Sequence, residues 1–149
     1  MTCGTFSLRA LLGRPVMLKG IRLGDPSDAV LDTESLRVVG LEVLCADGAR
    51  RFLPLAAARI RDDRVAVGSA LILLDEQDRE FYRPRSRTFR ALIGAPVEQE
   101  GRPLGELVDL VVAADGTVEA VAARANGSGA LLHESAGVTI SVTPKASAA

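Results

Sequence analysis

The stretch SLRALLGRPV at residues 7–16 returns as TFRALIGAPV at residues 88–97. The same spacing relates Leu23-Gly24 to Leu104-Gly105, and it relates Asp28 to Asp109. Self-similarity at a fixed period is the sequence signature of a repeated structural unit. The chain is therefore predicted to contain two copies of one fold.

Each copy is predicted to begin with a short helical turn. A hydroxyl residue, Ser7 or Thr88, can cap the free amides of that turn, and a glycine suited to a left-handed exit ends it. Pro15 or Pro96 then prevents further helix. Strands are expected to follow in both copies.

Short apolar strands separated by turn signals fill the rest of each copy. In the second copy, residues 107–113 and 118–125 are joined through Asp115-Gly116, a dipeptide typical of a tight hairpin. The other predicted elements are strands at 29–31, 36–45, 50–53, 65–74, 131–132 and 138–142, with a helical turn at 55–60. This pattern predicts an all-β chain of two tandem small antiparallel barrels, each with one or two short helical turns.

The predicted domains are a first repeat at 1–75, a charged linker at 76–87, a second repeat at 88–143 and a tail at 144–149. Units of this size have cores that supply only a few kcal/mol. We therefore expect the two units to pack on each other or on a second copy of the chain, which makes a homo-oligomer possible.

Composition narrows the class of protein. The 149 residues are 48% hydrophobic but only 3% aromatic, and the formal net charge is −1, which argues against nucleic-acid binding through a global positive field. There is no signal-peptide pattern and no apolar run of about 20 residues, so a cytoplasmic protein without an integral membrane segment is expected. Cys3 and Cys45 are expected to be reduced, although a disulfide between them stays open.

The order Leu-Leu/Ile-Gly-x-Pro-Val, then Leu-Gly, then an Asp four residues after that glycine, followed by an apolar hairpin, resembles the PRC-barrel family and occurs twice. Leu53-Pro54-Leu55 followed by residues 64–67 is similar to the closing part of the same domain, whereas residues 127–129 and 133–135 of the second copy depart from it. The family includes the cytoplasmic part of the photosynthetic reaction centre H subunit and the C-terminal domain of the ribosome maturation factor. The resemblance implies a small β-barrel adaptor and supplies no catalytic residue.

The residues suggest no reaction. The repeated Asp28 and Asp109 could indicate metal or acid–base chemistry, but a carboxylate beside a turn more often accepts backbone amides. His133, the only histidine, is interpreted as an exposed loop residue despite its neighbours Glu134 and Ser135. The glycines are turn glycines with no phosphate-binding arrangement. We therefore expect no catalytic residue, no cofactor and no metal.

One segment combines cations with aromatic rings. Its residues are the candidate partner-docking set, namely Phe81, Tyr82, Arg83, Arg85 and Arg87. Acidic neighbours offset this charge, so nucleic-acid binding is judged unlikely. The sequence favours a non-enzymatic adaptor with an unidentified protein partner, and the alternative is a ribosome-assembly or RNA-associated factor.

Overall fold

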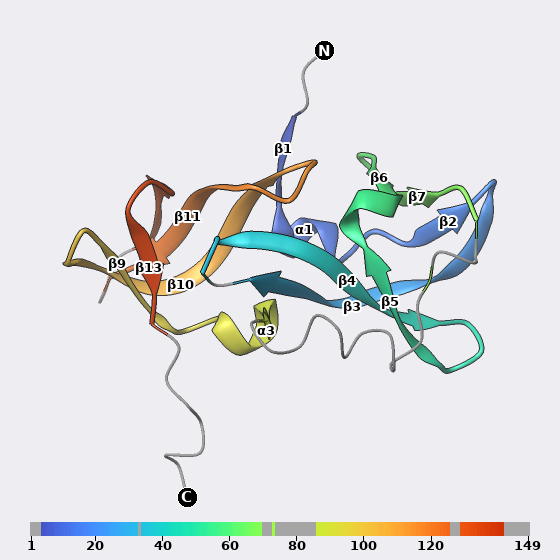
Figure 1. Ribbon diagram of the computed structural model, residues 1–149, viewed down its shortest axis with the longest axis horizontal. Helices are drawn as coiled ribbons and strands as arrows, with labels where there is room; N and C mark the ends of the chain where they lie inside the picture. Colours follow the sequence, from blue (N-terminus) through green and yellow to red (C-terminus); the bar gives the residue numbers. More distant parts are fainter. Residues whose placement is uncertain (1–3, 33, 70–72, 74–85, 126–128, 142–149) are drawn as a thin grey trace, which may run out of the picture.

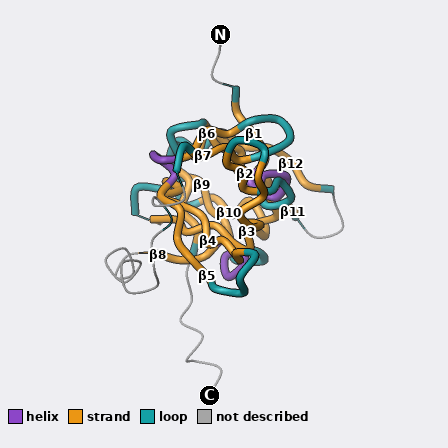
Figure 2. The backbone as a smooth tube through the Cα atoms, turned by 90° about the vertical axis from the view of Figure 1, so that its right-hand side faces the viewer, coloured by secondary structure: helices purple, strands orange, loops and turns teal. Residues whose placement is uncertain are grey.

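Strands make up most of the computed structural model, in which residues 4–32, 34–69, 73, 86–125 and 129–141 are described. They form two curled sheets that meet in the middle of the molecule (Figure 1). Helix is confined to short pieces (Figure 2). The prediction of a mostly β protein is confirmed at this level, and the closure of each sheet into a separate barrel stays a prediction.

The first sheet is built mainly from the first repeat. Its strands are β2 (Val16–Leu18), β3 (Ile21–Asp32), β4 (Arg37–Cys45), β5 (Arg50–Pro54), β6 (Ala58–Ile60), β7 (Val65–Val67) and β8 (Ser86–Thr88). They follow the order β5-β4-β3-β2-β7-β6, with β8 paired to β3. Pairing is antiparallel except between β2 and β7, which run parallel.

The second sheet is built mainly from the second repeat. Its strands are β1 (Thr5–Ser7), β9 (Pro96–Gln99), β10 (Arg102–Ala113), β11 (Val118–Arg124), β12 (Ala130–Glu134) and β13 (Val138–Ile140). They follow the order β12-β11-β10-β9-β13, with β1 paired to β10. Here β13 runs antiparallel to β9, whereas its counterpart β7 runs parallel to β2.

The two repeats exchange their first strands. β1 belongs to the first repeat but pairs with β10, while β8 precedes the second repeat and pairs with β3. Each exchanged strand leads directly into a four-residue helix, α1 (Leu8–Leu11) or α3 (Phe89–Leu92). The predicted linker was expected to run to Arg87, but β8 already begins at Ser86 because its residues pair with residues 30–32 of β3.

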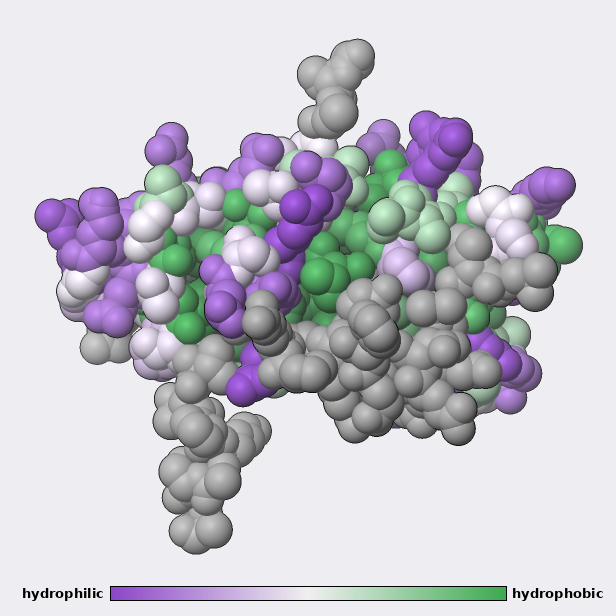
Figure 3. Space-filling model, in the orientation of Figure 1, coloured by the Kyte–Doolittle hydropathy of each residue, from purple (hydrophilic) through white to green (hydrophobic). Residues whose placement is uncertain are grey.

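One hydrophobic cluster joins the halves. The fully buried residues Leu8 and Leu11 of α1 and Phe89 and Leu92 of α3 belong to the same cluster as Leu110 of β10. Each such side chain contributes about 1.5–3 kcal/mol by leaving water. On the face drawn in Figure 3, apolar residues show in the middle of the molecule. The halves therefore share a core, as the small size of each unit led us to expect.

The repeated glycines Gly24 and Gly105 allow close strand contact. A Cβ atom at Gly24 would lie 2.4 Å from the carbonyl oxygen of Leu44, and one at Gly105 would lie 2.4 Å from that of Arg124. Any side chain would collide with the neighbouring backbone. The Leu-Gly dipeptide recurs because both sheets need this approach.

Several local predictions need correction. The helical turn expected at 55–60 is limited to the 3-10 turn η1 (Leu55–Ala57), because residues 58–60 pair with β7 as β6. The strand expected at 65–74 is present as β7, which ends at Val67, and residues 70–72 and 74 of that prediction lie outside the described residues. His133 lies in β12 and pairs with Val121, so its interpretation as a loop residue is wrong. The glycine exit is present at Gly94, with φ of 87°, but Gly13 has no positive φ.

Candidate docking surfaces

The repeated aspartates hold the exchanged helices in place. Asp109 Oδ1 accepts the backbone N–H of Arg9 at 3.1 Å and that of Leu110 at 2.7 Å, and the Ser7 hydroxyl donates to Oδ2. Ser7 Oγ in turn accepts the N–H of Ala10 at 3.2 Å, as predicted for a helix cap. The carboxylate therefore links β10 to the start of α1.

Asp28 makes the reciprocal contact. Its Oδ1 accepts the N–H of Ala29 at 2.8 Å and the N–H of Arg90, at the start of α3, at 3.0 Å. Thr88 makes no side-chain cap, contrary to the prediction, and Asp28 serves that end of the helix instead. The interpretation of both aspartates as acceptors of backbone amides is confirmed. Among the described residues, no three His, Cys, Asp or Glu side chains gather as a metal site.

A second contact joins the tips of the two long hairpins. The N–H of Val38 donates to the carbonyl of Gly116 at 2.8 Å, and Arg37 Nη2 donates to the carbonyl of Asp115 at 3.0 Å. Hydrogen bonds from Thr117 hold the pKa of the Asp115 carboxyl below its ordinary value. The start of β4 is thereby tied to the start of β11.

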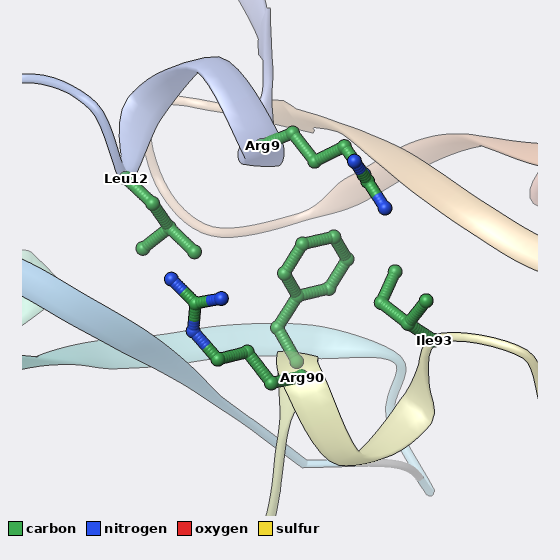
Figure 4. A pocket seen from close by; sticks show the side chains of 5 residues that line it. Arg9, Leu12, Arg90 and Ile93 are labelled. Atoms are coloured by element: carbon green, nitrogen blue, oxygen red, sulfur yellow. The ribbon is translucent and has the colours of Figure 1, made fainter.

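A pocket of about 250 Å³ lies between the two exchanged helices. Arg9 and Leu12 line it from the α1 side, and Phe89, Arg90 and Ile93 line it from the α3 side (Figure 4). The duplication relates Arg9 to Arg90 and Leu12 to Ile93, so each half supplies one arginine and one aliphatic side chain to the pocket.

The outer strand of the second sheet is apolar and uncovered. Leu131 and Leu132 of β12 are 62% and 67% exposed. Within the described part of the chain, β12 pairs with no strand other than β11. At the end of β12 the Glu134 carbonyl accepts a hydrogen bond from Gln99 Nε2 at 3.0 Å. An exposed edge with apolar side chains is a template for a further strand.

The equivalent strand of the first sheet has features that oppose such pairing. β5 carries Arg50 and Arg51 and ends at Pro54, and charge and proline both discourage strand addition. Arg51 Nη1 donates to Asp47 Oδ1 at 3.1 Å, which lowers the pKa of Asp47 and raises the pKa of Arg51. Of the two outer strands β5 and β12, as the structure describes them, only β12 exposes two adjacent leucines.

Most of the predicted docking set falls outside the described residues, namely Phe81, Tyr82, Arg83 and Arg85. Arg87 is exposed and lies in β8, opposite Leu31 of β3. The sequence interpretation missed Leu131 and Leu132, because their exposure depends on strand pairing. A signal was present in the sequence, since at the spacing of the repeat Leu131 and Leu132 stand where the first copy has Arg50 and Arg51.

No protein-family model matches the chain, and no curated protein matches it. The resemblance to the PRC-barrel family therefore stays a prediction. Among the described residues no helix is long and apolar enough to cross a membrane.

Proposed function

We propose that the chain is a non-enzymatic adaptor, composed of two PRC-barrel-like halves, that binds a partner protein along the outer edge of β12. The observation that carries this proposal is the exposure of Leu131 and Leu132 on a strand with one unpaired edge. Their counterparts on the first sheet are an arginine and a buried phenylalanine. Of the two equivalent outer strands in the described part of the chain, only β12 therefore presents this apolar surface.

The expected partner segment is an extended apolar strand of another protein. Main-chain hydrogen bonds to the edge supply affinity in this mode, and alternate side chains supply specificity. Covering Leu131 and Leu132 would contribute up to about 1.5–3 kcal/mol for each side chain. His133 and Glu134 at the end of β12 would favour polar groups at one end of the segment.

Photo-crosslinking in cells tests this proposal. A photoreactive phenylalanine at Leu132 is expected to capture a discrete protein, whereas the same group at the exposed Arg50 of β5 is expected to capture none. The purified complex should then show slowed hydrogen exchange at the amides of β12. Equal capture at both positions, or no slowing at β12, would contradict the proposal.

The double variant Leu131→Arg/Glu134→Pro gives β12 the edge chemistry of β5. By strand pairing, Leu131 corresponds to Arg51 and Glu134 corresponds to Pro54. The variant is expected to lose the crosslinked partner while retaining its unfolding midpoint, and Arg51→Ala on the other sheet is the matched control. Capture of a second copy of the chain alone would replace the adaptor with a homodimer.

The same crosslinking experiment distinguishes a protein-binding adaptor from an RNA-associated factor. Capture that disappears with ribonuclease, weakens as salt rises and requires Arg83, Arg85 and Arg87 would favour RNA binding and overturn the proposal.

A further inference from the structure

The pocket between α1 and α3 has a charge arrangement suited to an acidic ligand. Arg9 Nε donates to the carbonyl of Val108 at 2.9 Å, and Arg90 Nε donates to the carbonyl of Ser27 at 2.6 Å. These bonds anchor each arginine to the strand of the opposite half. A guanidinium has five N–H donors, so each anchored arginine keeps four for a ligand.

No described carboxylate neutralises these two cations by direct pairing. Among the described residues, no carboxylate oxygen lies within 4.0 Å of the guanidinium nitrogens of Arg9 or Arg90. Asp28 and Asp109 lie nearby but accept the backbone amides at the starts of the helices. The guanidinium groups are therefore held in place and available to an anion.

The two cations face apolar side chains across the pocket. In Figure 4 the guanidinium of Arg90 points toward Leu12, and that of Arg9 lies on the same side of the pocket as Ile93. The ring of Phe89 adds further apolar surface to the lining. A complementary group is apolar in its middle and negative at both ends.

The size of the pocket favours a side chain over a whole small molecule. Sites for drug-sized ligands measure about 300–1,000 Å³ and bury most of the ligand. This pocket holds about 250 Å³, and its two arginines are exposed. Such a volume suits one apolar side chain of a larger partner, while flanking acidic residues reach the rim.

We infer that this pocket binds an acidic segment of a partner protein, in which one apolar side chain lies between two carboxylates. The inference rests on the proposed function, because it assigns a second contact to a protein partner. It uses residues separate from those of β12, so each surface can be tested alone.

The test uses the peptide acetyl-Glu-Leu-Glu-amide and the full chain. NMR signals of the Arg9 and Arg90 Nε–H groups are expected to shift on titration, and Arg22 is the exposed control that lines no part of the pocket. The neutral peptide acetyl-Gln-Leu-Gln-amide should bind at least about tenfold more weakly, since charge-assisted hydrogen bonds are lost. Affinity for the acidic peptide should fall as salt rises.

Variants of Arg9 and Arg90 distinguish weaker binding caused by loss of charge from weaker binding caused by misfolding. Arg9→Gln and Arg90→Gln should each weaken the acidic peptide by about tenfold. Arg9→Lys and Arg90→Lys retain the charge and should restore part of that loss, and Arg22→Gln should change nothing. Unfolding midpoints measured on all of them identify any loss due to misfolding.

Three results would overturn the inference. They are unshifted Arg9 and Arg90 signals, equal affinity for the neutral peptide, and equal affinity for the free dicarboxylate suberate. The Leu131→Arg/Glu134→Pro variant should bind the acidic peptide normally. If that variant loses its crosslinked partner but keeps the peptide, the two surfaces are independent, and failure of one proposal is distinguishable from failure of the other.

Discussion

The two halves of the molecule begin alike and end differently. In both, an aspartate of the long strand receives the helix start of the other half. Counting across the sheets from that aspartate, Asp28 pairs with Glu42, which pairs with Phe52. In the other half, Asp109 pairs with Ala122, which pairs with Leu132. Phe52 is fully buried and Leu132 is 67% exposed, so equivalent positions have opposite environments.

The strands next to the outer strands, β4 and β11, also differ at an equivalent position. A Cβ atom at Gly40 would lie 2.3 Å from the ring of Phe52, so the glycine makes room for the aromatic side chain. The equivalent residue of β11 is Ala120, which pairs with Glu134 as Gly40 pairs with Pro54. The residues that hold the exchanged strands and helices are alike in both halves. The outer strands β5 and β12 differ in chemistry because, within the described residues, each pairs with only one other strand.

Separating the halves should have the largest effect. Fragment 1–85 lacks β8, which pairs with β3, and the following helix α3. Fragment 86–149 lacks β1, which pairs with β10, and the following helix α1. We expect each fragment alone to show no cooperative unfolding transition, and we expect the mixture to regain one at equimolar ratio, as measured by chemical denaturation and sedimentation. A fragment that unfolds cooperatively as a monomer would show that the exchange is dispensable for that half.

The second-largest effect is expected from truncating the side chains at the equivalent positions Phe52 of β5 and Leu132 of β12. The loss of unfolding free energy should differ between the two strands. Phe52→Ala should lower the free energy of unfolding by about 3–5 kcal/mol, because it removes a fully buried ring. Leu132→Ala should change it by no more than about 0.5 kcal/mol, because that side chain is exposed. Urea denaturation of both variants measures the contrast, and equal losses would mean that β12 is covered.

Removing the repeated carboxylates should affect both halves by similar amounts. Asp28→Ala and Asp109→Ala each leave two backbone amides without an acceptor, and each should cost about 3 kcal/mol of unfolding free energy. Asp25→Ala, which removes only an exposed pairing with Arg22, is the control and should cost less than about 1 kcal/mol. A loss confined to one aspartate would break the reciprocity between the halves.

The smallest expected effect concerns Asp115 at the hairpin tip of the second half. Its folded pKa lies below 3.8, so its contribution to stability is present above 3.8 and is lost as pH falls through the lowered folded pKa. Asp115→Asn should therefore flatten the stability profile in that acidic window and leave its slope at neutral pH unchanged. Denaturation curves across the window test this, and an unchanged acidic slope in the variant would contradict it.

Local sequence signals predicted many of the strands and turns. The hairpin at Asp115-Gly116 and the cap at Ser7 depend on residues within a few positions of each other, and both are present. The predicted acceptor role of Asp28 also holds, but the partner amide of Arg90 lies 62 residues away. The candidate docking residues are predicted from a local combination of arginines and aromatic rings between the repeats, and of these only Arg87 falls among the described residues.

By itself, the sequence determined the duplication, the strand-rich character and the positions where glycine and aspartate must recur, because periodicity and turn chemistry act over short distances. Only the tertiary structure decided that the first strands are exchanged, that Arg9 and Arg90 meet at one pocket, and that Leu132 is exposed while Phe52 is buried. Those outcomes depend on pairing and packing between residues far apart in the chain. Repeated local patterns are equally compatible with each half retaining its own first strand.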